Sequence, residues 1–324
     1  MLGFCGYGLY LVWPQVQPAL RHLQWYSVAA SAAAAAAGAG CMMLAWRALL
    51  ADLGSPLPVR ACVRINGLAQ LGKYVPGAVW SFAAMVELGH DYQVPRRRGF
   101  ASVAIGLAVG IGTGLVVAAV ALPLASASVA RHYLLALAVI PVILACLYPP
   151  VLGRLLNRAL VLLRQQPLEA PPTMRGLGLA VAWSLAGWLL YGLQVWLVAA
   201  DMTGHGAHIV LLVLGGYALA TSAGLLLVVF PAGIGAREVI MIAVFTLAMS
   251  RSAAVAIALV TRVLTTASDL GWGGIALLVR RAAARPVRGR HARSGKDEGC
   301  GQTADHQQAD YLGDRVLGSG NAQP

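Results

Sequence analysis

Long runs of apolar residues alternate along this chain with short segments that carry arginine, a pattern typical of membrane proteins with several transmembrane helices. Most runs are about 20 residues long, enough for a helix to cross the hydrocarbon core of a bilayer. They predict membrane-spanning helices at residues 28–50, 99–122, 133–152, 177–199, 208–230, 232–250 and 253–279. Residues 31–40 are almost all alanine or glycine, which predicts close packing of the first helix against another.

One segment, residues 65–94, does not fit a simple span because it is only moderately apolar and contains Lys73, Pro76 and Glu87. Arginines lie on both sides of it, so both of its ends are expected on the cytoplasmic side. A segment that enters and leaves on one side is a re-entrant hairpin, whose non-helical backbone must be buried in protein or line a wet cavity. We predict an all-α polytopic membrane protein of about seven to eight transmembrane helices, with this hairpin and a second Pro/Gly helix break.

The distribution of arginine also predicts the orientation. The linker at residues 153–176 carries four arginines, whereas the loop at 200–207 has Asp201 and no lysine or arginine. By the positive-inside rule the linker and the C-terminus are cytoplasmic. The expected organisation is an N-terminal segment at 1–27, which is a truncated first helix, a transmembrane domain at 28–279, and a basic, disordered cytoplasmic tail at 280–324.

Composition supports a membrane protein and argues against a nucleic-acid partner. Hydrophobic residues make up 59% of the chain and charged residues 11%, against about 25% charged in a typical soluble domain. The net charge of +12 comes from arginines in short loops and in the tail. That placement suits anionic lipid headgroups at the inner face of the cell membrane, and we expect no nucleic acid.

Two segments rich in proline and glycine interrupt the helical pattern, at residues 72–77 and 230–238. Proline removes a backbone donor and glycine permits a turn, so each break exposes peptide groups that need a partner. A pair of interrupted helices in the two halves of a transporter indicates its substrate site. The alternative is a proline kink filled by neighbouring side chains. Charged residues flank both breaks, namely Lys73 at the first and Arg237 with Glu238 at the second.

Two further charges lie within the last apolar run. Arg262 and Asp269 are seven residues apart, about two helical turns, and so share one face. Ionisable groups at membrane depth pair or line a path, which predicts a network of Glu238, Arg262 and Asp269 that is either structural or in contact with a ligand. Lys73 is one of only two lysines, and its compact ammonium suits a phosphate or a carboxylate.

Both breaks, with the charges of the last run, resemble the transmembrane, flippase-like domain of the lysylphosphatidylglycerol synthase family. The similar residues are Asn66, the run Gln70-Leu71-Gly72-Lys73-Tyr74-Val75-Pro76-Gly77, Val79-Trp80, the run Pro231-Ala232-Gly233-Ile234-Gly235-Ala236-Arg237-Glu238, Arg262 and Asp269. The resemblance covers roughly residues 28–279. In bifunctional members this domain precedes a soluble aminoacyl-transferase domain and moves the modified lipid between leaflets, but here only about 45 polar residues follow the last run.

The resemblance therefore implies a translocase without synthase activity, for an anionic lipid or a lipid-linked glycan of the cell envelope. One alternative is a non-transporting accessory or scaffold for an envelope biosynthesis enzyme. A lipid-modifying membrane enzyme is the third, but no HExxH or GxSxG motif is present, and we expect no catalytic residue, metal or cofactor. The residues expected to contact the substrate are Asn66, Gln70, Lys73, Tyr74, Pro76, Gly77, Trp80, Pro231, Gly233, Gly235, Arg237, Glu238, Arg262 and Asp269.

Overall fold

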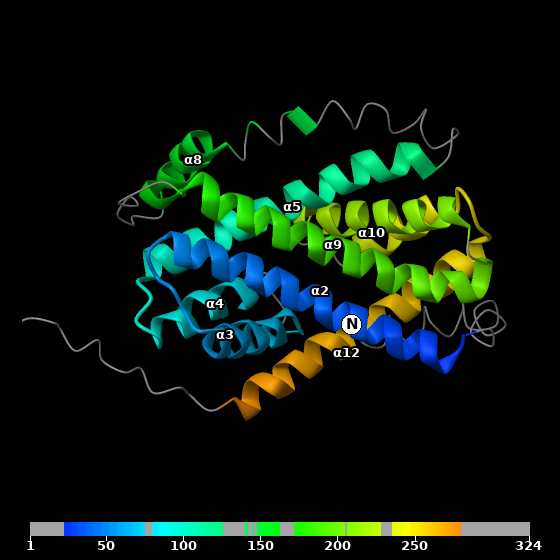
Figure 1. Ribbon diagram of the computed structural model, residues 1–324, viewed down its shortest axis with the longest axis horizontal. Coiled ribbons are helices and arrows are strands. Elements are labelled where there is room, and N and C mark those ends of the chain that lie inside the picture. The colour runs from blue at the N-terminus through cyan, green and yellow to red at the C-terminus, as the bar shows by residue number, and fades with distance from the viewer. Residues whose placement is uncertain are drawn as a thin grey trace, which may run out of the picture. The chain divides into compact units, whose positions relative to one another are not determined.

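The computed structural model describes residues 23–74, 80–125, 140–141, 145, 148–162, 172–204, 206–227 and 235–279, and these form helices joined by turns, without a strand (Figure 1). The helices are α2 (Trp25–Asp52), α3 (Val59–Leu71), the 3-10 helix η1 (Gly72–Tyr74), α4 (Trp80–His90), α5 (Arg96–Ala125), α8 (Pro149–Leu162), α9 (Met174–Thr203), α10 (Ala207–Leu227), α11 (Ala236–Phe245) and α12 (Arg251–Leu278).

Among the described residues, five helices are long and apolar enough to cross a membrane, namely α2, α5, α9, α10 and α12. They coincide with the spans predicted at 28–50, 99–122, 177–199, 208–230 and 253–279, which confirms an all-α polytopic membrane fold. The span predicted at 133–152 lies mostly outside the described residues. Those of its residues that are described include the start of α8, a helix that reaches Leu162 and so occupies part of the segment expected as a linker.

Polar contacts define two opposite ends of the helix bundle. At one end, here called the arginine end, Arg98 Nη1 donates to the carbonyl of Gly54 at 2.9 Å, and Asp52 accepts from the Thr173 backbone at 2.7 Å. At the other, here called the Asp201 end, Asp201 accepts from the Gln24 backbone at 3.0 Å and from Ser27 Oγ at 3.1 Å. These contacts set α2 antiparallel to α9.

Small residues bring α2 and α9 close together, as the alanine- and glycine-rich sequence predicted. A Cβ atom placed on Gly38 would lie 3.3 Å from the carbonyl oxygen of Gly187 and 3.1 Å from the Tyr191 ring. Ser31 Oγ donates to the Gln194 carbonyl at 2.8 Å between the same helices. The close approach increases dispersion contacts, which drive helix association where lipid removes the hydrophobic effect.

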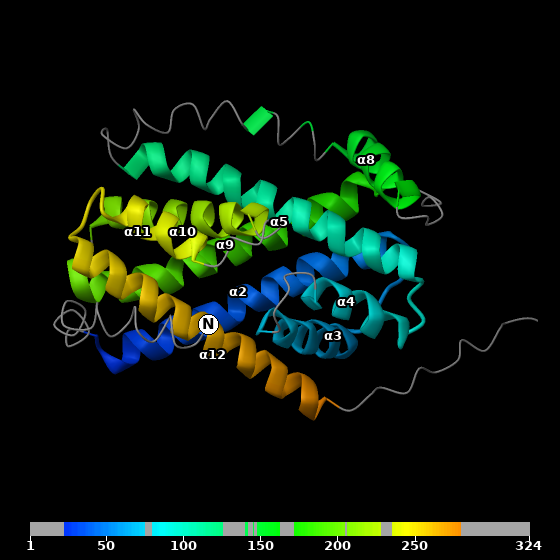
Figure 2. The same ribbon diagram turned by 180° about the vertical axis from the view of Figure 1, so that it is seen from behind.

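A helical hairpin of α3, η1 and α4 occupies the segment expected as a re-entrant hairpin at residues 65–94 (Figure 2). Helices of 13 and 11 residues are about 20 and 17 Å long, well short of the bilayer core of about 30 Å. Leu57 and Val94, which lie before and after the hairpin, belong to one buried cluster with Leu50. The hairpin thus begins and ends at the arginine end.

A second hairpin replaces the span predicted at 232–250. Helix α11 has only 10 residues, about 15 Å, and packs antiparallel against α10. A Cβ on Gly224 would meet Arg237 Cβ at 3.2 Å, and one on Gly216 would meet Phe245 at 2.8 Å. Helix α10 begins at the Asp201 end, so this hairpin returns there. Figure 2 shows the two hairpins at opposite ends of the bundle, with α12 passing both.

Candidate functional site

The tip of the first hairpin carries Lys73 and Tyr74 in the 3-10 turn that ends α3. Lys73 Nζ lies 3.4 Å from Asp269 Oδ2, and Tyr74 Oη donates to the same oxygen at 3.3 Å. The turn is compact because residue 72 is glycine: a Cβ there would lie 3.1 Å from the Ser81 backbone at the start of α4. Both polar groups at this tip are therefore directed at one carboxylate of α12.

The tip of the second hairpin carries Arg237 and Glu238 in the first turn of α11. Gly235, the residue before the helix, has a φ of +91°, a left-handed conformation that glycine adopts without strain. Arg237 Nη2 donates to Tyr217 Oη at 2.9 Å, and its guanidinium lies 4.8 Å from the centre of the Tyr217 ring. Glu238 Oε1 lies 3.3 Å from Arg262 Nη1 of α12.

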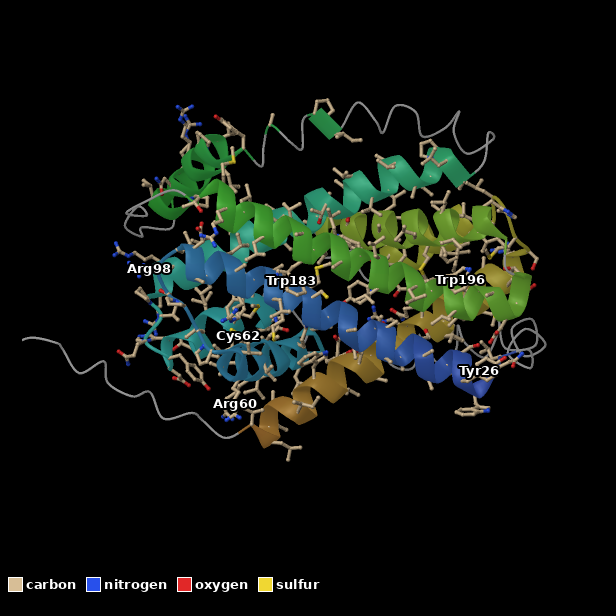
Figure 3. All side chains as sticks on the ribbon, viewed as in Figure 1. Tyr26, Arg60, Cys62, Arg98, Trp183 and Trp196 are labelled. Carbon is tan, nitrogen blue, oxygen red and sulfur yellow. The ribbon has the colours of Figure 1, made fainter. Side chains whose placement is uncertain are left out.

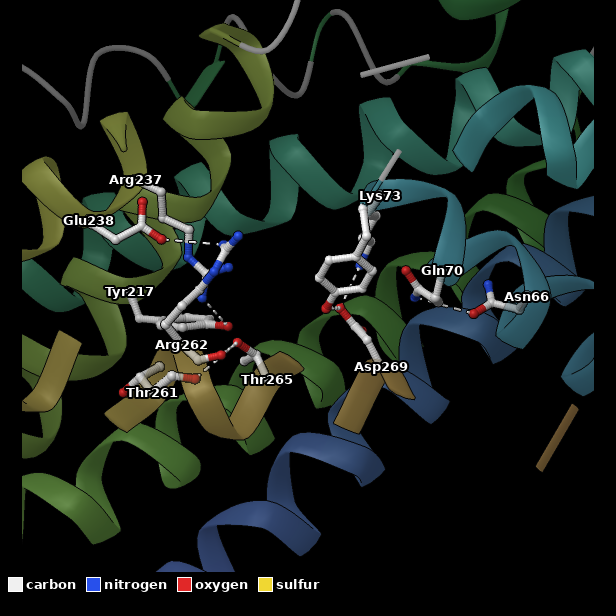
Figure 4. A network of polar contacts seen from close by, with 11 residues as sticks. Asn66, Gln70, Lys73, Tyr217, Arg237, Glu238, Thr261, Arg262, Thr265 and Asp269 are labelled. Carbon is white, nitrogen blue, oxygen red and sulfur yellow. Dashed lines mark hydrogen bonds and ion pairs between the residues drawn. The ribbon is translucent and has the colours of Figure 1, made fainter. Parts of the chain in front are cut away.

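Helix α12 therefore joins the two tips, since Arg262 and Asp269 both lie in the middle third of its 28 residues (Figure 4). The predicted network of Glu238, Arg262 and Asp269 is confirmed for the first pair only. Asp269 pairs with Lys73 and Tyr74 instead, because the first hairpin packs against α12 at that level. Thr265 Oγ1 donates to the Thr261 carbonyl at 2.9 Å, so the hydroxyl group of Thr265 has its hydrogen-bond partner within α12.

The five charged residues Lys73, Arg237, Glu238, Arg262 and Asp269 are here called the cluster. Two of its cations, Lys73 and Arg262, are more accessible than its carboxylates. The side chains of Lys73 and Arg262 are 48% and 55% exposed, against 17% for Asp269 and 31% for Glu238. Since Lys73 and Arg262 each use one N–H in a long ion pair with the described residues, they have further N–H groups that an incoming anion could accept from.

Not all the predicted site residues reach this cluster. Gln70 Nε2 donates to Asn66 Oδ1 at 3.4 Å, one turn back along α3, so this contact stays within α3 (Figure 4). Trp80 begins α4 beside the tip and is 56% exposed. Four predicted residues lie outside the described part of the chain, namely Pro76, Gly77, Pro231 and Gly233.

Three aromatic residues beside the cluster were not predicted from the sequence. Tyr217 of α10 is buried, and its ring centre lies 5.6 Å from that of Tyr191 and 6.4 Å from that of Trp188, both in α9. Tyrosine hydroxyls in an apolar run were the available signal, because a buried hydroxyl needs a hydrogen-bond partner. Their relation to Arg237 depends on how α9, α10 and α11 pack, which is a property of the fold. Figure 3 draws the side chains of the described residues on the ribbon.

The arrangement is suited to binding an anion rather than a metal. Guanidinium and ammonium groups donate charge-assisted hydrogen bonds to phosphate or carboxylate oxygens. Within the described ranges, no group of three histidine, cysteine, aspartate or glutamate side chains is placed to hold a metal ion.

A family model described as the lysylphosphatidylglycerol synthase TM region matches residues 2–273 of the chain. This match covers both hairpins and most of α12. No curated protein matches the chain, and no solved structure does.

Proposed function

Because the chain belongs to the family of the lysylphosphatidylglycerol synthase transmembrane region, we propose that it is a translocase that moves an anionic lipid, or a lipid-linked glycan, across the cell membrane. The headgroup would bind between the two hairpin tips, at Lys73, Arg237 and Arg262. Its acyl or polyprenyl chains would stay in the surrounding lipid.

The observation that supports this proposal is the placement of Lys73 and Arg237 at the tips of two hairpins whose helices are each too short to cross a membrane, with Arg262 in the middle of α12 beside them. Charged side chains at membrane depth are costly, and they mark substrate paths and sites. Irregular backbone at this depth is tolerated where it is buried in protein or lines a wet cavity. A headgroup phosphate would bring the negative charge that the half-exposed cations attract.

The proposal can be tested in proteoliposomes of the purified protein that contain phosphatidylglycerol with a fluorescent acyl chain. Dithionite added outside destroys the outer-leaflet fluorescence, and the later slow loss reports lipid that has crossed. We expect the protein to speed this loss well above that of protein-free vesicles. Lys73→Gln and Arg237→Gln should each slow it by at least about fivefold, since each removes a charge-assisted contact.

Arg251→Gln is the matched control, because Arg251 lies at the Asp201 end of α12, away from the cluster. It should transport as the unchanged protein does. Wild-type protein that speeds the loss of neither labelled phosphatidylglycerol nor a labelled polyprenyl phosphate would contradict the proposal. It would favour an accessory that recruits an envelope biosynthesis enzyme.

A further inference from the structure

The charges at the two hairpin tips do not balance. Lys73 and Asp269 form one ion pair, and Arg262 and Glu238 form another, at 3.4 and 3.3 Å. The remaining cation is Arg237, whose contacts among the described residues are with the uncharged Tyr217. The cluster therefore carries one net positive charge, and the structure places that charge on Arg237.

The surroundings of Arg237 hold its guanidinium in place without neutralising it. The Tyr217 hydroxyl accepts one N–H at 2.9 Å, and the ring of the same residue lies under the guanidinium at 4.8 Å. Tyr217 is 3% exposed and is itself fixed between Trp188 and Tyr191. A guanidinium has five N–H donors in a rigid fork, so donors remain for a phosphate.

We infer that this site selects a headgroup with a single net negative charge, such as a phosphodiester, that Arg237 binds its phosphate, and that Tyr217 is the positioning residue for Arg237. The inference rests on the proposed function and narrows its substrate class. One negative charge beside Arg237 makes the occupied cluster neutral, which is the least costly state at membrane depth. A doubly charged phosphomonoester would leave one excess negative charge.

The two ion pairs are poorer candidates for the main phosphate contact. An anion can share the spare donors of Lys73 or Arg262, but one that took either cation as its main partner would compete with Asp269 or Glu238 and leave that carboxylate less well paired, at a cost in free energy. An anion that binds Arg237 displaces no carboxylate. The pairs then fasten each hairpin tip to α12 and set the net charge of the cluster.

The test measures binding to the full-length protein in detergent, as thermal stabilisation by three short-chain lipids at about pH 8, above the second pKa of a phosphomonoester of about 6. Dihexanoyl phosphatidylglycerol carries one negative charge, dihexanoyl phosphatidic acid carries close to two, and dihexanoyl phosphatidylcholine is neutral overall. The unchanged protein should bind the first at least about tenfold more tightly than either other, the size of one charge-assisted contact.

Variants then separate the roles of the charges. Arg237→Gln should lose the preference for phosphatidylglycerol over phosphatidylcholine. Asp269→Asn raises the net charge of the cluster by one and should shift the preference to phosphatidic acid; Glu238→Gln makes the same change at the other pair. The double variant Lys73→Gln with Asp269→Asn keeps the net charge, so it should bind phosphatidylglycerol more weakly, because the Lys73 contact is lost, but should still prefer it to phosphatidic acid. Tyr217→Phe, which retains the ring, should lose part of the preference, and Tyr217→Leu more of it.

The outcomes distinguish this inference from the proposed function. A wild-type protein that no anionic lipid stabilises would overturn both. Stabilisation by anionic lipids that survives Arg237→Gln would overturn the inference and leave the translocase proposal standing. So would an unchanged preference in both Asp269→Asn and Glu238→Gln, since each alters the charge on which the selection depends. Equal preference in Tyr217→Leu and the unchanged protein would remove Tyr217 from the positioning role.

Discussion

Arg262 and Asp269 show what sequence spacing predicts about single residues and what it does not. Seven residues on one helix place both side chains on one face, and the structure has both at the hairpin tips. The partner of Asp269 was not predictable, because Lys73 is 196 residues away and its position depends on the packing of α3 against α12. Spacing within a helix is a local property, whereas pairing between helices is a property of the fold.

At this scale the ion pair between Arg262 and Glu238 gives a first prediction. Arg262→Gln and Glu238→Gln should each lower the free energy of unfolding by about 1 kcal/mol, the upper range for a partly exposed pair. The double variant should recover most of that loss, because neither partner is then left unpaired. Thermal unfolding in detergent measures all three. Additive losses in the double variant would show that the two side chains do not interact.

At the scale of elements, the span expected at residues 232–250 was the main error of the sequence analysis, although the Pro/Gly break at its start was predicted. Residues 232–250 are apolar enough for a span, yet the helix within them begins only after the left-handed Gly235 and ends at Phe245. Hydropathy averages over a window and so does not detect where a helix stops. The first hairpin was predicted correctly because arginines at both ends placed them on one side.

The packing of the first hairpin against α12 depends on Gly67. A Cβ there would lie 2.5 Å from the Trp272 carbonyl and 2.7 Å from Ala276 Cβ. Gly67→Ala should therefore push the two helices apart and lower the free energy of unfolding by about 1–3 kcal/mol. Gly110→Ala in α5 is the control, since among the described residues no atom outside the adjacent helix backbone lies within 4 Å of a Cβ placed there. It should be neutral or slightly stabilising because alanine favours helix.

The two hairpins also predict which positions share a side of the membrane. Single cysteines in place of Arg64 and His90 should react with a membrane-impermeant reagent from the same side, because both lie in the first hairpin. Cysteines in place of Gly204 and Ser250 should share the opposite side. If the cysteines at positions 64 and 90 react from different sides, the segment between them is an ordinary membrane span. The proposed site would then lose its main support.

At the scale of the whole molecule, the arginine distribution predicts which end faces the cytoplasm. Arg47, Arg64 and Arg98 all donate to backbone carbonyls at the arginine end. In intact cells, a cysteine placed at Gln165 or Gly301 in a protein free of its native cysteines should therefore not react with an impermeant reagent from outside. Efficient labelling from outside at either position would show that the protein has the opposite orientation.

The opposed hairpins have a consequence for thermodynamics. Each reaches the charged cluster from its own end of the bundle, with a tip tied to α12 by one ion pair. In a translocase built this way, a headgroup would meet a similar element from either leaflet, and neither direction would be driven by the protein alone. Such a protein acts as a catalyst of exchange and speeds both directions equally. Net flow is then set by reactions that produce the lipid on one face of the membrane and consume it on the other.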